Sequence, residues 1–218
     1  MSELPSRLIL ASSSPRRREL LTQAGYTFTV EAADVDESVS PGESPADYVR
    51  RLAEEKAQAV FARHAESSGA PSMTASSSWV GSNDLSLIVL GADTTVMLDG
   101  EILAKPADAS DAKRMLRRLS GRTHEVLTGV AAATRAGVVS AVESTSVTFS
   151  EIPEVELDFY CATHEPMDKA GAYGIQGYAA RWIPRIDGDY FNVMGLPIAR
   201  VVRLIEAAVP GNSTYRTE

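Results

Sequence analysis

The chain has 218 residues, 44% of them hydrophobic, which is enough for one large α/β domain or two small ones. Its formal net charge of −8, from 21 basic and 29 acidic residues, argues against general binding to nucleic acids or membrane surfaces, which needs a basic field. One cysteine, Cys161, allows no internal disulfide, and neither a signal-peptide pattern nor an apolar run of about 18 residues occurs, so we expect a cytoplasmic protein.

The first predicted elements are a buried strand and a helix joined by a serine-rich turn. The apolar run 8–11 predicts the strand. Ser14 is a favourable N-cap, Pro15 suits the first helical position, and Gly25 fits the position just past the helix end. This local chemistry predicts a strand, a turn and a helix in direct succession.

Three consecutive arginines occupy the first turn of that helix. A cation there opposes the helix dipole, whereas the unpaired backbone N–H groups at the same end favour an anion. The planar guanidinium can bind two phosphate oxygens at once. Arg16 and Arg17 therefore indicate a phosphate-binding turn, with an ordinary solvated basic turn as the alternative.

The next segment combines a short strand at 27–30, an acidic stretch and a long helix from about Pro45 to about His64. The acidic residues Asp36 and Glu37 belong either to a solvated loop or to a carboxylate supply for Mg²⁺. Lys56 flanks the apolar stripe of the helix. It either extends along the surface to reach water or points into a cleft to meet an anion.

Residues 67–86 are rich in Ser, Gly, Ala, Pro and Asn, which predicts a flexible insertion away from the chemistry. The continuous apolar run 87–90 then predicts a strand buried on both faces, ending in residues 91–95. Open α/β sheets bind ligands at the carboxyl ends of their strands, and Asp93 is placed there. It is a candidate catalytic carboxylate, with a turn cap as the alternative.

Asp99-Gly100 predicts a tight hairpin that leads to Lys105, which is either a second phosphate ligand or an exposed lysine. Ser110 is predicted to cap a helix that ends before Gly121. The remaining predicted elements are strands at 125–133 and 138–150, helices at 154–163 and 197–208, and a loose tail at 210–218.

A glycine-rich segment at 169–177 can bring the backbone close to a ligand. The amide of Gln176 could read a base edge, since it both donates and accepts hydrogen bonds. His124 could donate a proton, but a single histidine at the start of a strand is more typical of a structural role.

Six motifs follow one another along the chain, at residues 11–17, 91–94, 105–106, 120–124, 170–177 and 192–197. In content and order they resemble the Maf family of nucleoside triphosphate pyrophosphatases. The resemblance runs from about residue 8 to residue 208, and 67–86 resembles an insertion relative to the family.

The resemblance implies one α/β domain with an inosine-triphosphatase-like fold, a long curved mixed sheet with helices in two lobes around a central cleft. It implies cleavage of a nucleoside triphosphate to the monophosphate and pyrophosphate, with Asp93 as the proton acceptor that activates water. The residues implied to contact the triphosphate are Ser12, Arg16, Arg17, Lys56 and Lys105. Arg16, Thr94 and Gln176 match the positions that mark the subfamily preferring dTTP and UTP.

The resemblance also implies a divalent cation, Mg²⁺ first and Mn²⁺ or Co²⁺ as alternatives, with metal ligands left open beyond the weak candidates Asp36 and Glu37. The implied partners are a nucleoside triphosphate and a second copy of the chain, without stable nucleic acid or a membrane. Two alternatives stay open. One is broad or 7-methyl-GTP-type specificity, and the other is a non-catalytic nucleotide-binding regulator, since the family is linked to septum formation and cell-division arrest.

Overall fold

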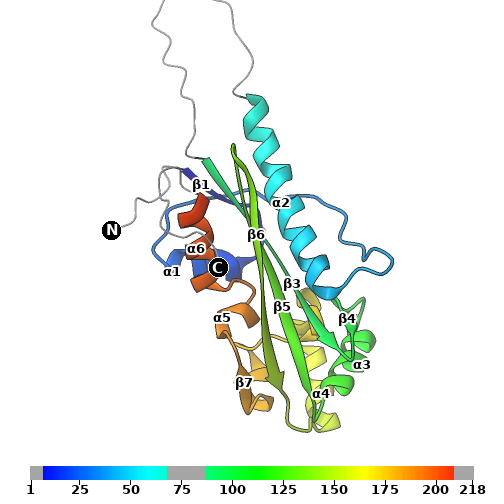
Figure 1. Cartoon of the computed structure of the whole chain (residues 1–218). Helices are drawn as coiled ribbons and strands as arrows, with labels where there is room; N and C mark the ends of the chain where they lie inside the picture. Colours follow the sequence, from blue (N-terminus) through cyan, green and yellow to red (C-terminus); the bar gives the residue numbers. More distant parts are fainter. Residues whose placement is uncertain (1–6, 68–86, 209–218) are drawn as a thin grey trace, which may run out of the picture.

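A mixed sheet runs the length of the molecule, with helices on both of its faces (Figure 1). The computed structural model describes residues 7–67 and 87–208. Apart from Ser67, the predicted insertion at 67–86 lies outside the described residues, as does the predicted tail at 210–218. The elements are β1 (Arg7–Leu10), α1 (Pro15–Gln23), β2 (Thr29–Val30), α2 (Pro45–Ser67), β3 (Leu87–Leu98), β4 (Glu101–Leu103), α3 (Ala109–Leu119), β5 (Thr123–Thr134), β6 (Gly137–Thr148), α4 (Glu154–Ala162), η1 (Glu165–Asp168), η2 (Ala170–Ala172), η3 (Tyr178–Trp182), β7 (Arg185–Asp187), α5 (Tyr190–Val193) and α6 (Ile198–Ala208).

Within residues 7–67 and 87–208, the sheet has seven strands. Six follow the order β2-β1-β3-β5-β6-β7, and β4 pairs with β3 beside this path. The strands β2, β1 and β3 are parallel, and β5, β6, β7 and β4 are joined by antiparallel pairings. The mixed sheet and its helices confirm the predicted α/β class.

Helices cover both faces of the sheet because its central strands are apolar on both faces. Along β1, Leu8 and Leu10 pack into one core cluster, whereas Ile9 packs into a second cluster together with Ala53 and Val60 of α2. Successive side chains of a strand point to opposite faces, so the unbroken apolar run buries both sides. Figure 1 shows α2 along one face, and the other helices pack against the large cluster on the opposite face.

Two glycines let α2 lie directly on the sheet. A Cβ atom at Gly91 would lie 2.1 Å from the carbonyl oxygen of Ala53, and one at Gly129 would lie 2.1 Å from that of Val49. Both distances are far below any van der Waals contact, so only glycine permits this approach. The helix backbone therefore packs closely on β3 and β5. This packing brings the Lys56 side chain beside Asp93 of β3.

The strand expected to end at Asp93 is longer than predicted. β3 continues from Leu87 to Leu98 because β5 pairs with it antiparallel from Val89 to Met97. What ends near this point is the neighbouring parallel strand β1, whose pairing with β3 stops at Leu90. Asp93 therefore lies within a strand, just beyond the carboxyl end of its parallel neighbour, between the pairings of β3 with β1 and with β4.

Turn and cap chemistry was predicted well, with one exception. The Ser14 side chain accepts the Arg17 N–H at the start of α1, and the hairpin residues Asp99 and Gly100 have φ of 55° and 80°. The predicted Ser110 cap is wrong. Asp108 caps α3 by accepting the backbone N–H of residue 111 at 2.8 Å, and Ser110 lies inside the helix. An ionised carboxylate is the stronger acceptor at the positive end of a helix.

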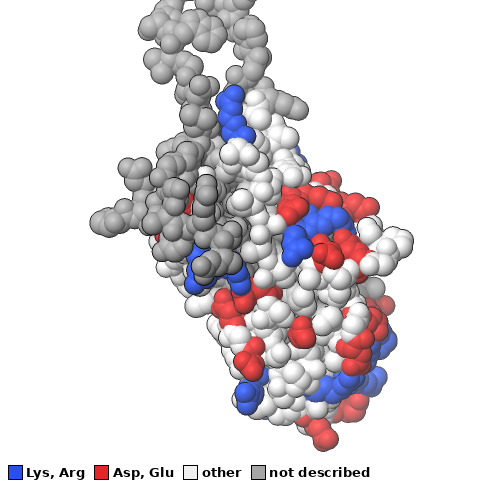
Figure 2. Space-filling model, in the orientation of Figure 1, with Lys and Arg blue, Asp and Glu red and all other residues white. Residues whose placement is uncertain are grey.

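Basic and acidic side chains alternate on the face seen in Figure 2, as over α3 and α4. There, Lys113 donates to Asp158, and Arg117 donates to Glu154 at 2.6 Å. Among the described residues, no helix combines the length and the apolar character that crossing a membrane requires.

Candidate active site

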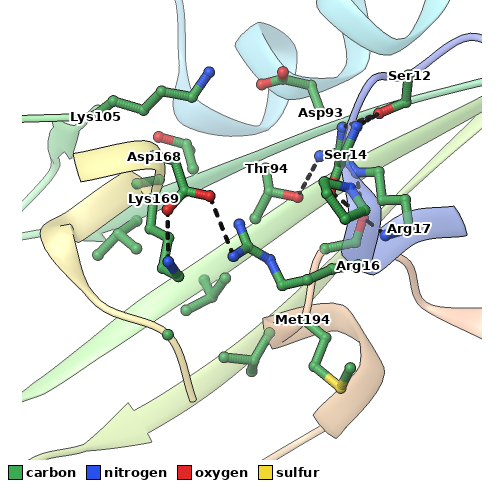
Figure 3. Close-up of a pocket in the computed structure, with 18 of the residues that line it drawn as sticks. Ser12, Ser14, Arg16, Arg17, Asp93, Thr94, Lys105, Asp168, Lys169 and Met194 are labelled. Atoms are coloured by element: carbon green, nitrogen blue, oxygen red, sulfur yellow. Dashed lines mark hydrogen bonds and ion pairs between the residues drawn. The ribbon is translucent and has the colours of Figure 1, made fainter. Parts of the chain in front are cut away.

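A cleft of about 800 Å³ opens where β3 lies between its pairings with β1 and β4 (Figure 3). Its walls come from the first turn of α1, the middle of β3, the hairpin end at Lys105, and the segment from η1 to the loop that follows η2. The volume is in the range of small-molecule sites. The predicted site residues that line the cleft are Ser12, Arg16, Arg17, Glu37, Lys56, Asp93, Thr94, Lys105 and Gln176. Asp36 is exposed and is not among the lining residues.

The Lys56 ammonium lies between two carboxylates. Its Nζ donates to Asp93 Oδ1 at 2.7 Å and to Glu37 Oε1 at 2.6 Å. Asp93 and Lys56 are buried, whereas the Glu37 side chain is 47% exposed. Burial raises the pKa of the Glu37 carboxyl, but the hydrogen bond and charge of Lys56 outweigh it, so the pKa lies below its ordinary value. Of the two alternatives for Lys56, the structure supports the one in which it points into a cleft.

The two carboxylates fit a magnesium ion that also binds phosphate. Mg²⁺ in phosphate-transferring sites is held by one or two carboxylates together with substrate phosphates and water. Glu37 and Asp93 supply that number, since both reach the same ammonium. Within residues 7–67 and 87–208, no cluster of three or more His, Cys, Asp or Glu residues forms a metal cage. A magnesium ion held by these two carboxylates would take its other oxygen ligands from water or substrate phosphates.

The Arg17 side chain donates four hydrogen bonds to other residues in the described part of the chain. Its Nε donates to the Gly195 carbonyl at 2.8 Å, and its Nη1 donates to the Ala92 carbonyl at 2.8 Å and to Ser12 Oγ at 3.3 Å. Its Nη2 donates to Thr94 Oγ1 at 2.9 Å. A guanidinium has five N–H donors, so four contacts leave one donor for a ligand. Arg17, the predicted phosphate ligand, therefore also links the turn after β1, strand β3 and the loop before α6.

Arg16 lies next to Arg17 in the first turn of α1, and its side chain reaches across the cleft toward η1. Its Nη1 lies 3.5 Å from Asp168 Oδ2 on η1, as the dashed line in Figure 3 shows. Asp168 also accepts from Lys169 Nζ, at 2.5 Å. Burial raises the pKa of the Asp168 carboxyl. Lys169 and Arg16 together lower this pKa by more than burial raises it, so the net shift is downward. Asp168 therefore stays ionised opposite Arg16.

The loop with Gln176 is packed against η1 through its glycines. A Cβ atom at Gly177 would lie 1.8 Å from Glu165 Oε1, and one at Gly174 would lie 2.8 Å from Lys169 Cε. At these two glycines the backbone lies close to side chains of the protein itself, and the predicted approach to a ligand stays a prediction. Gln176 is exposed at the cleft wall. The Lys105 side chain is 61% exposed, and its Nζ lies 3.9 Å from Glu37 Oε2.

His124 lies away from the cleft lining and is buried. Its Nε2 lies 2.7 Å from the Tyr173 hydroxyl, and its ring meets Phe149 edge to face with centroids 5.0 Å apart. Burial lowers the pKa of its imidazole to about 4. The ring is therefore neutral near pH 7, in keeping with the structural role.

Several residues at the cleft were not predicted. Asp168 and Lys169 stand at the start of the glycine-rich segment, and this adjacency is a signal that could have found them. Gly195 lies in the motif at 192–197 but was assigned no role. Thr128 is fully buried in the middle of β5, and nothing in its local sequence distinguishes it from a core strand residue.

Together, the fold and the site define a mixed α/β protein with a cation-lined cleft that opens beside a buried aspartate. The sequence matches the family described as Maf-like protein over residues 7–208. The chain therefore belongs to the Maf family, which confirms the resemblance seen in its motifs.

Curated relatives are similar over almost the whole chain. The dTTP/UTP pyrophosphatase of Bacillus cytotoxicus is 48% identical over 95% of this chain and 98% of the relative. The dTTP/UTP pyrophosphatase of Koribacter versatilis is 50% identical over 92% of this chain and 94% of the relative. The solved structure of the Staphylococcus aureus Ham1 protein is a weaker match, with a TM-score of 0.39 and 13% identity over 66% of this chain and 72% of that one.

Proposed function

We propose that this chain hydrolyses dTTP and UTP to the nucleoside monophosphate and pyrophosphate. Relatives named dTTP/UTP pyrophosphatase, at 48% and 50% identity over more than nine tenths of the chain, support the substrate class. The observation that carries the proposal is the contact of the Lys56 ammonium with the buried Asp93 carboxylate, next to the arginine-rich first turn of α1.

Cleavage between the α and β phosphates requires neutralisation of several negative charges and a water molecule held in line with the leaving group. The cations that line the cleft are Arg16, Arg17, Lys56, Lys105 and Lys169. The N-terminal end of α1 adds its dipole and free backbone N–H groups. Asp93 is the proposed general base, because its carboxylate lies at the cleft wall and Lys56 orients it.

Glu37 and Asp93 are the proposed metal ligands. A carboxylate has two oxygens, so Asp93 could hold the cation with one of them and accept the proton of the attacking water with the other. When bound, the divalent cation neutralises phosphate charge and polarises the scissile bond. Lys56 donates to both carboxylates and so holds them together. If these carboxylates held a cation instead, the Lys56 ammonium would be available to contact a phosphate oxygen. Asp36 is dropped as a ligand candidate because its side chain accepts from the Ser38 N–H, outside the cleft lining.

The decisive experiment measures pyrophosphate release from dTTP, UTP, CTP, GTP and 7-methyl-GTP with Mg²⁺, Mn²⁺ or Co²⁺. Wild type is compared with Asp93→Asn and with the control Asp187→Asn, which changes an exposed aspartate paired with Arg185 at 3.8 Å. We expect release from dTTP and UTP that is lost in Asp93→Asn and kept in Asp187→Asn. Release from 7-methyl-GTP instead would move the chain to the sister specificity. Tight nucleotide binding without turnover would identify a regulator.

Three further proposals concern the protein as a whole. We place it in the cytoplasm, and its one cysteine, Cys161, is a free, buried thiol, as fits a reducing compartment. A homodimer and an effect on cell-division arrest rest on the family alone. Sedimentation tests the dimer, and expression of Asp93→Asn tests whether the cellular effect needs catalysis.

A further inference from the structure

A series of hydrogen bonds through two threonine hydroxyls leads from the cleft into the sheet. Arg17 Nη2 donates to Thr94 Oγ1 at 2.9 Å, Thr94 Oγ1 lies 3.0 Å from Thr128 Oγ1, and Thr128 Oγ1 donates to the Asn192 carbonyl at 3.0 Å. Thr94 and Thr128 face each other across β3 and β5, and Thr128 is fully buried. These hydrogen bonds thus connect a cleft arginine with helix α5.

Counting protons fixes the direction of every bond in this series. A threonine hydroxyl has one proton, and a carbonyl can only accept. The Thr128 proton goes to the Asn192 carbonyl, so the Thr94 proton must go to Thr128. The Thr94 oxygen is then free to accept from Arg17, and its proton is not available to a bound nucleotide.

We propose that Thr128 is a positioning residue for nucleotide binding, which acts through Thr94 to hold the Arg17 guanidinium in the cleft. The inference rests on the proposed function and deepens it. It also gives Thr94, one of the positions that mark the dTTP/UTP subfamily, an indirect role: it receives Arg17 and donates nothing to the substrate. Without the Thr128 hydroxyl, the Thr94 hydroxyl can rotate and turn its proton toward Arg17.

The test uses the full chain and compares wild type with Thr128→Val, Thr128→Ser, Thr94→Val and the double variant Thr94→Val/Thr128→Val. Valine keeps the shape of threonine and removes the hydroxyl, whereas serine keeps the hydroxyl. Thr123→Val is the control, because Thr123 also pairs across strands with a threonine, Thr148, with their Oγ1 atoms 2.9 Å apart, but lies outside the cleft lining. For each, kcat and KM are measured with dTTP, well below the melting temperature.

Loss of one hydrogen bond in a series that ends on a charged group is expected to raise the KM of Thr128→Val by about tenfold. We expect Thr94→Val to show the same rise, the double variant to show no further rise, and Thr128→Ser and Thr123→Val to keep the wild-type KM. A merely destabilised protein loses active molecules, which lowers kcat and leaves KM unchanged, so that pattern overturns the inference.

Thr94→Val breaks the same series of hydrogen bonds between Arg17 and Thr128. Its KM therefore tests the inference even if Thr128→Val does not fold. An unchanged KM in Thr94→Val, or multiplied effects in the double variant, overturns the inference. The proposed function fails separately, because in that case wild type itself releases no pyrophosphate from dTTP or UTP.

Discussion

The Lys56 ammonium balances two carboxylates within one cleft, Asp93 at 2.7 Å and Glu37 at 2.6 Å. Lys56→Met keeps much of the packing of the side chain and removes this charge. The carboxylates then repel each other, and the pKa of Glu37 rises because its largest favourable contact is gone. We expect kcat/KM for dTTP to fall about 100-fold, and the acidic limb of the pH profile to move to higher pH.

The matched control for this change is Lys113→Met. Lys113 also contacts two carboxylates, Glu154 at 3.1 Å and Asp158, but on the outer surface of α3 and α4. Its loss should leave kcat/KM and the pH profile unchanged. Equal effects of the two substitutions would show that Lys56 matters only for stability.

His124 makes the stability of the protein depend on pH. Burial lowers the pKa of its imidazole from 6.5 to about 4, so the unfolded chain binds a proton more readily than the folded one. Stability from this group is complete above pH 6.5 and is lost as the pH falls from there toward 4. At pH 5 the loss amounts to about 2 kcal/mol by linkage.

Urea unfolding at pH 7 and pH 5 measures this loss. His124→Asn removes the titrating ring, so the difference in unfolding free energy between the two pH values should shrink by about 2 kcal/mol. His164→Asn, at an exposed histidine with φ of 61° that asparagine tolerates, should retain the wild-type difference. An undiminished difference in His124→Asn would mean that the ring does not resist protonation.

The contact between α2 and the sheet depends on Gly91, since a Cβ atom there would lie 2.1 Å from the Ala53 carbonyl oxygen. Gly91→Ala must push α2 away, which loosens the packing and moves Lys56 from Asp93. We expect a loss of unfolding free energy of about 3 kcal/mol, with a fall in dTTP turnover among the molecules that remain folded. Thermal melting and single-turnover assays measure the two effects.

Gly42→Ala separates this clash from the general cost of replacing a glycine. Gly42 has φ of +77°, and no atom of the described residues lies within 4 Å of its added Cβ, so alanine there suffers backbone strain without a clash with them. We expect a loss of about 1 kcal/mol without a change in turnover. If both variants behave alike, the close approach of α2 does not position Lys56.

Local chemistry explains which elements the sequence could predict. Ser14-Pro15 and Asp99-Gly100 act within a few residues, so the start of α1 and the β3–β4 hairpin could be predicted without the fold. The extent of β3 could not, because its pairing partners on β5 lie 28 to 44 residues further along the chain, from the pair Met97 and Glu125 to the pair Val89 and Ala133. Sequence position likewise suggested Ser110 as a cap, although Asp108 has the stronger acceptor.

The site shows the same division. Its residues were predicted individually and through motifs, but their contacts depend on tertiary packing. Lys56 and Asp93 are 37 residues apart in sequence and meet because Gly91 and Gly129 admit α2 to the sheet. The link between Thr94 and Thr128 needs the antiparallel register of β3 and β5. The residues that adjoin Lys56, Asp93, Thr94 and Thr128 in the sequence do not indicate either contact.

At the scale of the whole molecule, whose net charge is −8, the cleft lining brings five basic side chains together with four acidic ones. The Arg16–Asp168 pair, at 3.5 Å, joins its two walls, α1 on one side and η1 on the other (Figure 3). The pair is partly exposed, at 32% and 65% for the two side chains, so it contributes little to stability. Its effect is on the ligand, because Asp168 competes with an incoming phosphate for Arg16.

Asp168→Asn should therefore improve nucleotide binding. It frees Arg16 and removes one negative charge from the cleft mouth, and we expect the KM for dTTP to fall about threefold at low salt. Raising the salt to about 0.5 M should reduce the difference, since screening weakens both effects. Asp187→Asn, which removes the same charge from an exposed pair with Arg185, should leave the KM unchanged. A KM that rises in Asp168→Asn would mean that the carboxylate holds Arg16 in its binding position and does not compete for it.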